Sequence, residues 1–186
     1  MVAVGVVLKN GDELFADRVI SNADARVTFL DLVEPQHLPG DFVSDIRRYR
    51  VASPACKVNL SLDGLPTFRS LPRGKEALLR GSIEIAPSID YVERAYDDAK
   101  YGRWARDPML ECTMATALDD SLAPPGQHVA SLFCQHVAPQ LPDGRSWDDC
   151  RDEVADLMIA TVDRYAPNFK ASVLGRQIMS PLELER

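Results

Sequence analysis

Runs of apolar and polar residues along the chain predict that it begins with a β-hairpin. Residues 2–9 are rich in β-branched side chains, and Asn10-Gly11 follows them. This dipeptide favours a type I′ turn, which needs positive φ at both central positions. Residues 13–20 then form a second apolar run, typical of a returning strand. The next four residues predict a junction into a helix, with Asn22 or Asp24 as its cap.

Strict alternation marks the clearest strand that follows the hairpin. Cys56, Val58, Leu60 and Leu62 fall on one side, and the polar residues between them fall on the other. This pattern predicts a half-buried strand with one face in water. Further strands are expected near Ile83 and Ile85 and over 110–117, 129–137 and 169–178.

Apolar residues at helical spacing predict helices between these strands. Two short helices are expected near 27–33 and 41–49, and two more start after the caps Ser88 and Ser146. The predicted order is β-β-α-α-β-β-α-β-β-α-β. Because strands and helices do not alternate strictly, this order favours an α+β fold. We expect a largely antiparallel mixed sheet with helices packed on one face, preceded by the hairpin.

Composition and charge exclude several classes of protein. The chain has 186 residues, 46% hydrophobic and 26% charged, with a net charge of −7, which is ordinary for a globular protein. Its acidic balance argues against nucleic acid as a partner. No apolar run reaches the roughly 20 residues of a transmembrane segment. Four scattered cysteines without a Cys-x-x-Cys motif indicate reduced thiols and a cytoplasmic protein.

Candidate chemistry is sparse. The sequence has no glycine-rich dinucleotide or triphosphate loop. His128, Cys134 and His136 lie at even spacing on one predicted strand, with Cys112 on a nearby strand, but the spacing matches no structural zinc pattern. A Cys134–His136 nucleophile is the other possibility, weighed against an inert core thiol, which the sequence favours. We therefore expect no metal site and no complete catalytic site in this chain.

Several longer motifs resemble the phytoene desaturase-like FAD-dependent oxidoreductases. They are Gly5-Val6-Val7-Leu8-Lys9-Asn10-Gly11-Asp12-Glu13, Ala16-Asp17-Arg18-Val19-Ile20-Ser21-Asn22-Ala23-Asp24, Pro87-Ser88-Ile89-Asp90-Tyr91-Val92-Glu93-Arg94-Ala95, Ser131-Leu132-Phe133-Cys134-Gln135-His136-Val137 and Ala166-Pro167-Asn168-Phe169. The resemblance covers nearly the whole chain. It is strongest to the branch named for a pyridine nucleotide-disulfide oxidoreductase domain.

The resemblance implies that the chain is a piece of a larger flavoenzyme. Residues 1–33 would be a residual part of the FAD-binding domain, and 34–186 an incomplete substrate-binding domain. Ser21, Asn22 and Ala23 would lie near the FAD, although a helix-capping junction explains the same residues without flavin. The intact enzyme would take hydride from an apolar substrate, whereas the isolated chain would be inactive, would bind no FAD and would form homo-oligomers. The alternative is a stand-alone α+β module that binds an apolar ligand or a protein.

Overall fold

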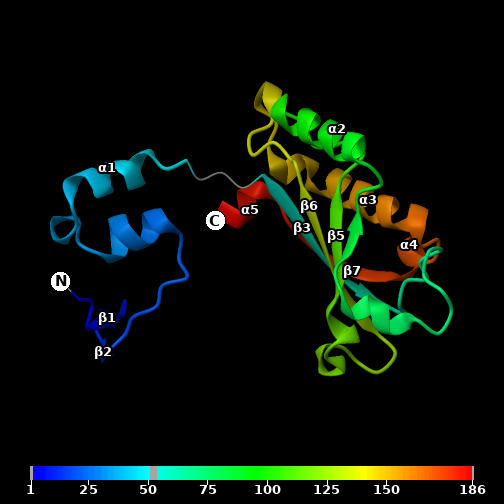
Figure 1. Ribbon diagram of the computed structural model, residues 1–186, viewed down its shortest axis with the longest axis horizontal. Helices are drawn as coiled ribbons and strands as arrows, with labels where there is room; N and C mark the ends of the chain where they lie inside the picture. The colour runs from blue at the N-terminus through cyan, green and yellow to red at the C-terminus, as the bar shows by residue number, and fades with distance from the viewer. Residues whose placement is uncertain (1, 51–53, 186) are drawn as a thin grey trace. The chain divides into compact units, whose positions relative to one another are not determined.

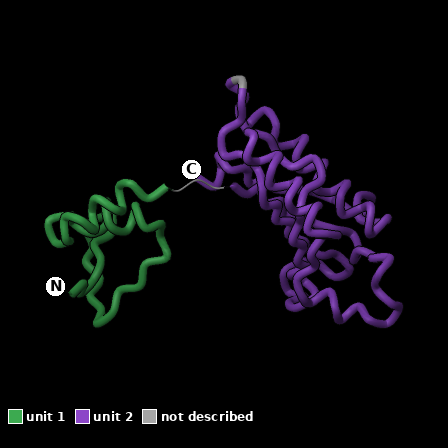
Figure 2. Tube along the Cα trace, turned by 45° about the horizontal axis from the view of Figure 1, so that its top comes forward, with its two compact units in different colours: residues 1–51 green, residues 52–186 purple. Residues whose placement is uncertain are grey.

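The computed structural model of the chain describes residues 2–50 and 54–185 (Figure 1). The chain divides into two compact units, residues 1–51 and residues 52–186 (Figure 2). We call them unit 1 and unit 2 and describe each by itself.

Unit 1 begins with the predicted hairpin. Strands β1 (Gly5–Val7) and β2 (Glu13–Phe15) pair antiparallel. The strands are shorter than the predicted 2–9 and 13–20, because a pair without further sheet neighbours has few partners to extend it. The type I′ prediction was wrong. Among the described non-glycine residues only His136 has positive φ, so Asn10 does not, whereas Gly11 has φ +90°.

The hydrogen bonds of the hairpin loop explain the difference in turn type. The Gly11 N–H donates to the Leu8 carbonyl at 2.9 Å, and the Leu8 N–H donates to the Asp12 carbonyl at 2.8 Å. This pattern fits a three-residue loop in which a type I turn is followed by a left-handed glycine. Asn10 contributes through its side chain, whose amide donates to an Asp12 carboxylate oxygen.

The rest of unit 1 is helical, but it buries little. A π-helical turn (Val27–Leu32), a 3₁₀ turn (Pro35–His37) and α1 (Gly40–Arg48) follow the hairpin. Phe29 and Phe42 meet edge to face, with ring centroids 5.0 Å apart. Val43 is nevertheless the one buried hydrophobic residue among the described part of this unit, while Ile20 is 93% exposed. Unit 1 therefore has almost no core of its own.

Unit 2 contains one five-stranded sheet with the order β4-β5-β6-β3-β7, and every pairing is antiparallel. Its strands are β3 (Ala55–Leu62), β4 (Ile83–Ile85), β5 (Leu110–Met114), β6 (His128–Gln135) and β7 (Val173–Met179). The α+β class and the antiparallel sheet are thus confirmed.

The helices of unit 2 are α2 (Ile89–Lys100), α3 (Trp147–Tyr165), α4 (Phe169–Ser172) and α5 (Pro181–Glu185). Helices α2 and α3 lie on the same side of the sheet (Figure 1). Both predicted caps are confirmed. The Ser88 hydroxyl accepts from the Tyr91 N–H, and the Ser146 hydroxyl accepts from the Asp148 N–H.

Parts of two predicted strands are helical instead. Residues 169–178 were expected to be one strand, but the first four form α4, in which the Ser172 hydroxyl donates to the Phe169 carbonyl at 2.7 Å. This short helix buries the Phe169 ring completely, so tertiary packing outweighs the strand preference of the local sequence. The predicted 110–117 strand ends at Met114 and continues as a 3₁₀ turn over Ala115–Ala117.

The core of unit 2 lies between the sheet and its helices. Alternate residues of the central strands, among them Val58, Leu60 and Leu132, are buried there against Met158 of α3 and Phe169 of α4. The residues between them face the other way, so the second face of the sheet is free of these helices. The wet strand face predicted from residues 56–62 is confirmed.

Candidate functional site

Ser21, Asn22 and Ala23 lie in the hydrogen-bonded junction that precedes the π-helical turn. The Ser21 hydroxyl is 2.8 Å from the Thr28 hydroxyl, and it accepts from the Ala23 N–H at 3.3 Å. Asp24 is the cap, because one of its carboxylate oxygens accepts from the Arg26 N–H at 2.7 Å. All three candidate residues are exposed. Their place near a flavin stays a prediction.

The two histidines on or next to β6 have partners of their own. The Nδ1 atom of His128 lies 3.1 Å from the Thr116 hydroxyl. His136 follows the end of β6 with φ 65° and packs its ring edge to face against Tyr96, at 5.7 Å between centroids. This left-handed residue breaks the alternation that was expected to align it with Cys134. Over residues 2–50 and 54–185, no group of three possible ligands surrounds a metal position.

The cysteines of the sheet are core residues. Cys56 and Cys134 stand opposite each other on β3 and β6, and both point into the packed side. Burial raises the pKa of Cys56 and of Cys112 to about 12. Burial, together with the neighbouring Cys56, also raises the pKa of Cys134. A thiolate is the reactive form of cysteine. These values therefore favour the core-thiol interpretation over a Cys134–His136 nucleophile.

Asp98, a member of one acidic pair in the sequence, is buried. Its carboxylate accepts from the Arg106 backbone N–H at 3.0 Å and from the Arg106 guanidinium at 3.0–3.2 Å. Burial alone would raise the pKa of Asp98, but these hydrogen bonds and the positive charge hold it below its usual range. Asp98 therefore anchors the loop after α2. Nothing in the sequence distinguished it from its neighbour Asp97, which is half-buried.

The face of the sheet that α2 and α3 do not cover carries a hydrogen-bonded group of polar side chains, which is the strongest candidate for a binding site. A ladder crosses three strands: the Ser131 hydroxyl donates to the Asn59 amide oxygen at 3.0 Å, and the Asn59 amide donates to the Gln177 amide oxygen at 3.2 Å. Because these side chains bind one another, their positions on the sheet are fixed. We call this surface the open face. Its residues are Lys57, Asn59, Ser61, Glu84, Glu111, Thr113, Val129, Ser131, Phe133, Gln177 and Met179.

A shallow hollow of about 310 Å³ lies in the open face. Five residues line it: Lys57, Glu111, Thr113, Ser131 and Phe133. Phe133 stands opposite Lys57 on one side and opposite Glu111 on the other. The hollow therefore has an aromatic floor between a cation and an anion. The alternation within the strands was the signal that could have identified these residues.

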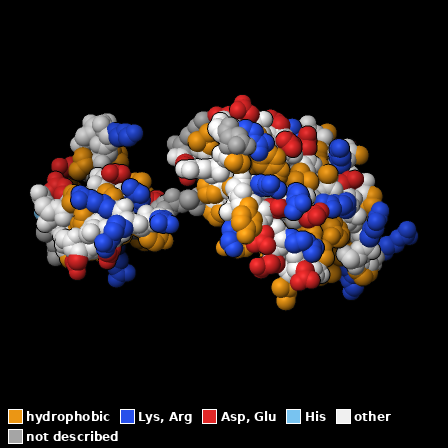
Figure 3. All heavy atoms as spheres, turned by 90° about the horizontal axis from the view of Figure 1, so that it is seen from above, with side chains coloured by type: hydrophobic (Ala, Val, Ile, Leu, Met, Phe, Trp, Pro, Cys, Tyr) orange, Lys and Arg blue, Asp and Glu red, His pale blue; other side chains and the backbone are white. Residues whose placement is uncertain are grey.

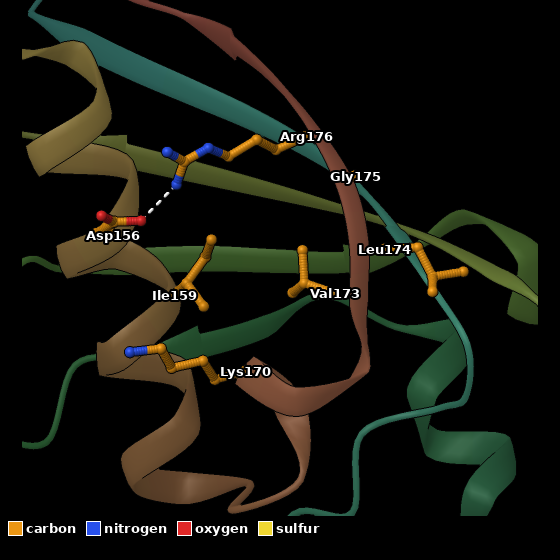
Figure 4. Close-up of a pocket in the computed structure, with 7 residues that line it drawn as sticks. All are labelled: Asp156, Ile159, Lys170, Val173, Leu174, Gly175 and Arg176. Carbon is orange, nitrogen blue, oxygen red and sulfur yellow. Dashed lines mark hydrogen bonds and ion pairs between the residues drawn. The ribbon is translucent and has the colours of Figure 1, made fainter.

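A second hollow, of about 350 Å³, lies beside the edge strand β7 (Figure 4). Ile159 of α3 and Val173 and Leu174 of β7 contribute its apolar lining. Arg176 reaches from β7 to α3, where it pairs with Asp156 and, at 2.7 Å, with Asp152. The positive charge of Arg176 is therefore neutralised by ion pairs within unit 2. Figure 3 shows basic and acidic side chains interspersed over unit 2, with no large patch of one sign on the face in view.

Comparison with known sequences identifies relatives but no matching family model. Pyridine nucleotide-disulfide oxidoreductase domain-containing protein 2 of Mus musculus is 37% identical over 99% of this chain and 33% of its own length. Prolycopene isomerase of Daucus carota and phytoene dehydrogenase of Streptomyces griseus are each 26% identical over 96% of the chain. The aligned region spans 27% of the Daucus carota protein and 36% of the Streptomyces griseus protein.

Two solved structures share the fold. A Pyrococcus furiosus protein aligns with a TM-score of 0.53 at 15% identity, over 94% of this chain and 34% of its own. An oxidoreductase from Methanosarcina mazei aligns with a TM-score of 0.50 at 18% identity, over 96% and 34%. None of the described helices is long and apolar enough to cross a membrane. The chain is thus related, as its motifs predicted, to the pyridine nucleotide-disulfide oxidoreductase and phytoene dehydrogenase proteins, and it spans about a third of the length of these relatives.

Proposed function

We propose that this chain is a segment of an FAD-dependent oxidoreductase, in which residues 34–186 contribute the substrate-binding domain and residues 1–33 a part of the flavin domain. The similarity to the mouse oxidoreductase-domain protein carries this proposal, because it extends over 99% of the chain but only 33% of that relative. The chain alone would then be inactive.

The surface of unit 1 supports a role within a larger protein. Its exposed apolar side chains include Val7 (71%), Phe15 (76%) and Ile20 (93%). Side chains of this kind are normally covered in a folded protein. We infer that a flavin domain supplied by the rest of the enzyme covers them, and that the isolated chain associates through them into homo-oligomers. Light scattering that gives a monomer at micromolar concentration would contradict the second inference.

The residues of the junction fit a peripheral contact with the flavin. Ser21 has a hydroxyl that already binds Thr28 and the Ala23 N–H, and Ala23 has a small exposed side chain. Since the chain has no glycine-rich dinucleotide loop, the diphosphate would be held elsewhere. The flavin, when bound, supplies the hydride-accepting chemistry. Residues of this chain would orient the substrate and exclude water.

The names phytoene dehydrogenase and prolycopene isomerase support an apolar substrate for the intact enzyme. The four free, buried cysteines support a reducing compartment, which we take to be the cytoplasm.

Reconstitution tests the proposed function. The chain is purified, saturated with FAD and freed of unbound ligand, and we expect no flavin absorbance to remain. Co-expression with the rest of the mouse relative as a separate polypeptide should give a yellow complex. Within that complex, Ala23→Leu should lower flavin retention, while Ala16→Leu, an exposed residue of the same unit, should not. Stoichiometric FAD on the chain alone would refute the proposal.

A further inference from the structure

The geometry of the open face points to a small zwitterionic ligand with an aromatic or apolar body, bound over Phe133 between Lys57 and Glu111. The ligand's anionic group would meet Lys57 and its cationic group would meet Glu111. This inference goes beyond the proposed function, because it adds a site for a polar ligand to the domain for which an apolar substrate is proposed above. The binding itself depends only on the described residues of unit 2.

The three residues lie on one row across the sheet. Lys57 of β3 pairs in register with Phe133 of β6, and Phe133 pairs with Glu111 of β5. Neighbouring strands are about 4.8 Å apart, so the backbones of Lys57 and Glu111 are roughly 10 Å apart. Two charged groups at this separation leave room for a small molecule above the aromatic ring.

The Lys57 and Glu111 side chains are both half-buried. Neither has an ion-pair partner among residues 2–50 and 54–185. A partly desolvated charge gains more from a bound counter-charge than an exposed one does. Glu84 of β4 stands directly opposite Glu111, so two carboxylates face the cationic end of the ligand. The site therefore has a positive end and a negative end with a fixed polarity.

Hydrogen bonds hold one side of the hollow in place before any ligand arrives. Ser131, on the next row of β6, is held by Asn59, which is in turn held by Gln177. Groups that are already ordered lose less conformational freedom on binding. Ser131 and Thr113, which also line the hollow, offer hydroxyls to a polar ligand.

A hydrocarbon ligand suits this surface poorly. Phe133 is the one apolar residue of the five that line the hollow. A polyene lying there would displace water from Lys57 and Glu111 without replacing its hydrogen bonds, which is unfavourable. The hollow in the open face is therefore proposed for a polar ligand and not for the apolar substrate that the names of the carotenoid enzymes support.

The test uses the full chain, labelled with ¹⁵N, and follows its amide signals during titration. The probes are L-phenylalanine, 3-phenylpropionate without the ammonium, 2-phenylethylamine without the carboxylate, and geraniol as an isoprenoid alcohol. We expect L-phenylalanine to bind in the millimolar range and to shift amides of β3, β5 and β6. Each single-charge analogue should bind roughly tenfold more weakly, because one charge-assisted contact is lost.

Variants then test which residue binds each charged group of the ligand. Lys57→Gln and Glu111→Gln should each weaken L-phenylalanine binding by about tenfold. The double swap Lys57→Glu with Glu111→Lys should restore only part of it, because Glu84 remains opposite position 111 and competes with the ligand's carboxylate. Lys170→Gln, in the hollow beside β7, is the matched control and should leave binding unchanged.

Several results would overturn the inference. They are equal binding of L-phenylalanine and 3-phenylpropionate, preferential binding of geraniol, shifts confined to the hollow beside β7, or no shifts with tens of millimolar probe. Circular dichroism on each variant establishes that it is folded. Since no step involves flavin, a failed reconstitution with FAD would refute the proposed function and leave this result standing, and the reverse also holds.

Discussion

Removal of the Asp98 carboxylate should detach the loop that follows α2. The buried carboxylate accepts the Arg106 backbone N–H, and it also receives the Arg106 guanidinium, whose side chain is 75% exposed. In Asp98→Ala, the backbone N–H loses its partner inside the protein. A hydrogen bond to a charged group contributes about 1.5–3 kcal/mol, and screening by solvent reduces the expected loss to about 1–2 kcal/mol.

Two further variants separate the parts of this interaction. Asp98→Asn keeps an oxygen that can accept the backbone N–H, so it should cost less than Asp98→Ala. Arg106→Ala removes the exposed guanidinium but keeps the backbone bond, and it too should be milder than Asp98→Ala. Urea unfolding at neutral pH, followed by far-ultraviolet circular dichroism, measures all three free energies of unfolding.

The pH dependence of the free energy of unfolding provides an independent check on the contribution of the Asp98 carboxylate. The pKa of Asp98 is lowered in the folded protein. Its contribution to stability is therefore complete above the unfolded-state pKa of about 3.9 and is lost as the pH falls through the folded-state value. The difference between the parent chain and Asp98→Asn should shrink on acidification below about pH 4. A difference that stays constant as the pH falls well below about 4, or an Arg106→Ala loss equal to that of Asp98→Ala, would refute the reasoning.

Three other predictions follow from local geometry. A Cβ on Gly5 would lie 2.3 Å from the Leu14 carbonyl oxygen, so Gly5→Ala should abolish the cross-strand nuclear Overhauser contacts of the hairpin, whereas Gly40→Ala, with open space around it, should preserve them. The four cysteines are buried, so they should react with a thiol reagent only as the protein unfolds, and rapid reaction at neutral pH would contradict their assignment to the core. Ser146→Ala should lower the free energy of unfolding of unit 2 by about 1 kcal/mol, because α3 loses its cap; an unchanged urea midpoint would show that the cap is dispensable.

Much of the fold could be predicted because its signals are local. Alternation placed β3 correctly, and the caps Ser88 and Ser146 placed the starts of α2 and α3. The misplaced elements depend on distant contacts. Residues 169–172 form a helix because the Phe169 ring fills a position between the sheet and α3, and no local pattern reports that position. The hairpin turn depended on a φ angle that the dipeptide Asn10-Gly11 does not determine.

The candidate site was predictable only in part. The polar side of β3 was visible as Lys57, Asn59 and Ser61, but its neighbours could not be known before the strand order was known. Phe133 lies between Lys57 and Glu111 only because β6 separates β3 from β5. Conversely, the even spacing of Cys134 and His136 suggested a shared face, and the left-handed backbone at His136 prevents it. Long-range register and single-residue backbone angles are the information that the pattern lacks.

The position of β3 within the sheet affects how the chain can fold during synthesis. Its two neighbours, β6 and β7, both lie far downstream, and Lys57 pairs with Met179 more than a hundred residues later. At roughly 5–20 residues per second, a ribosome needs many seconds to complete the second partner. During that interval a strand with one apolar face and two unpaired edges is available to chaperones and to other nascent chains. Slow folding dominated by non-local pairing is the expected kinetic consequence.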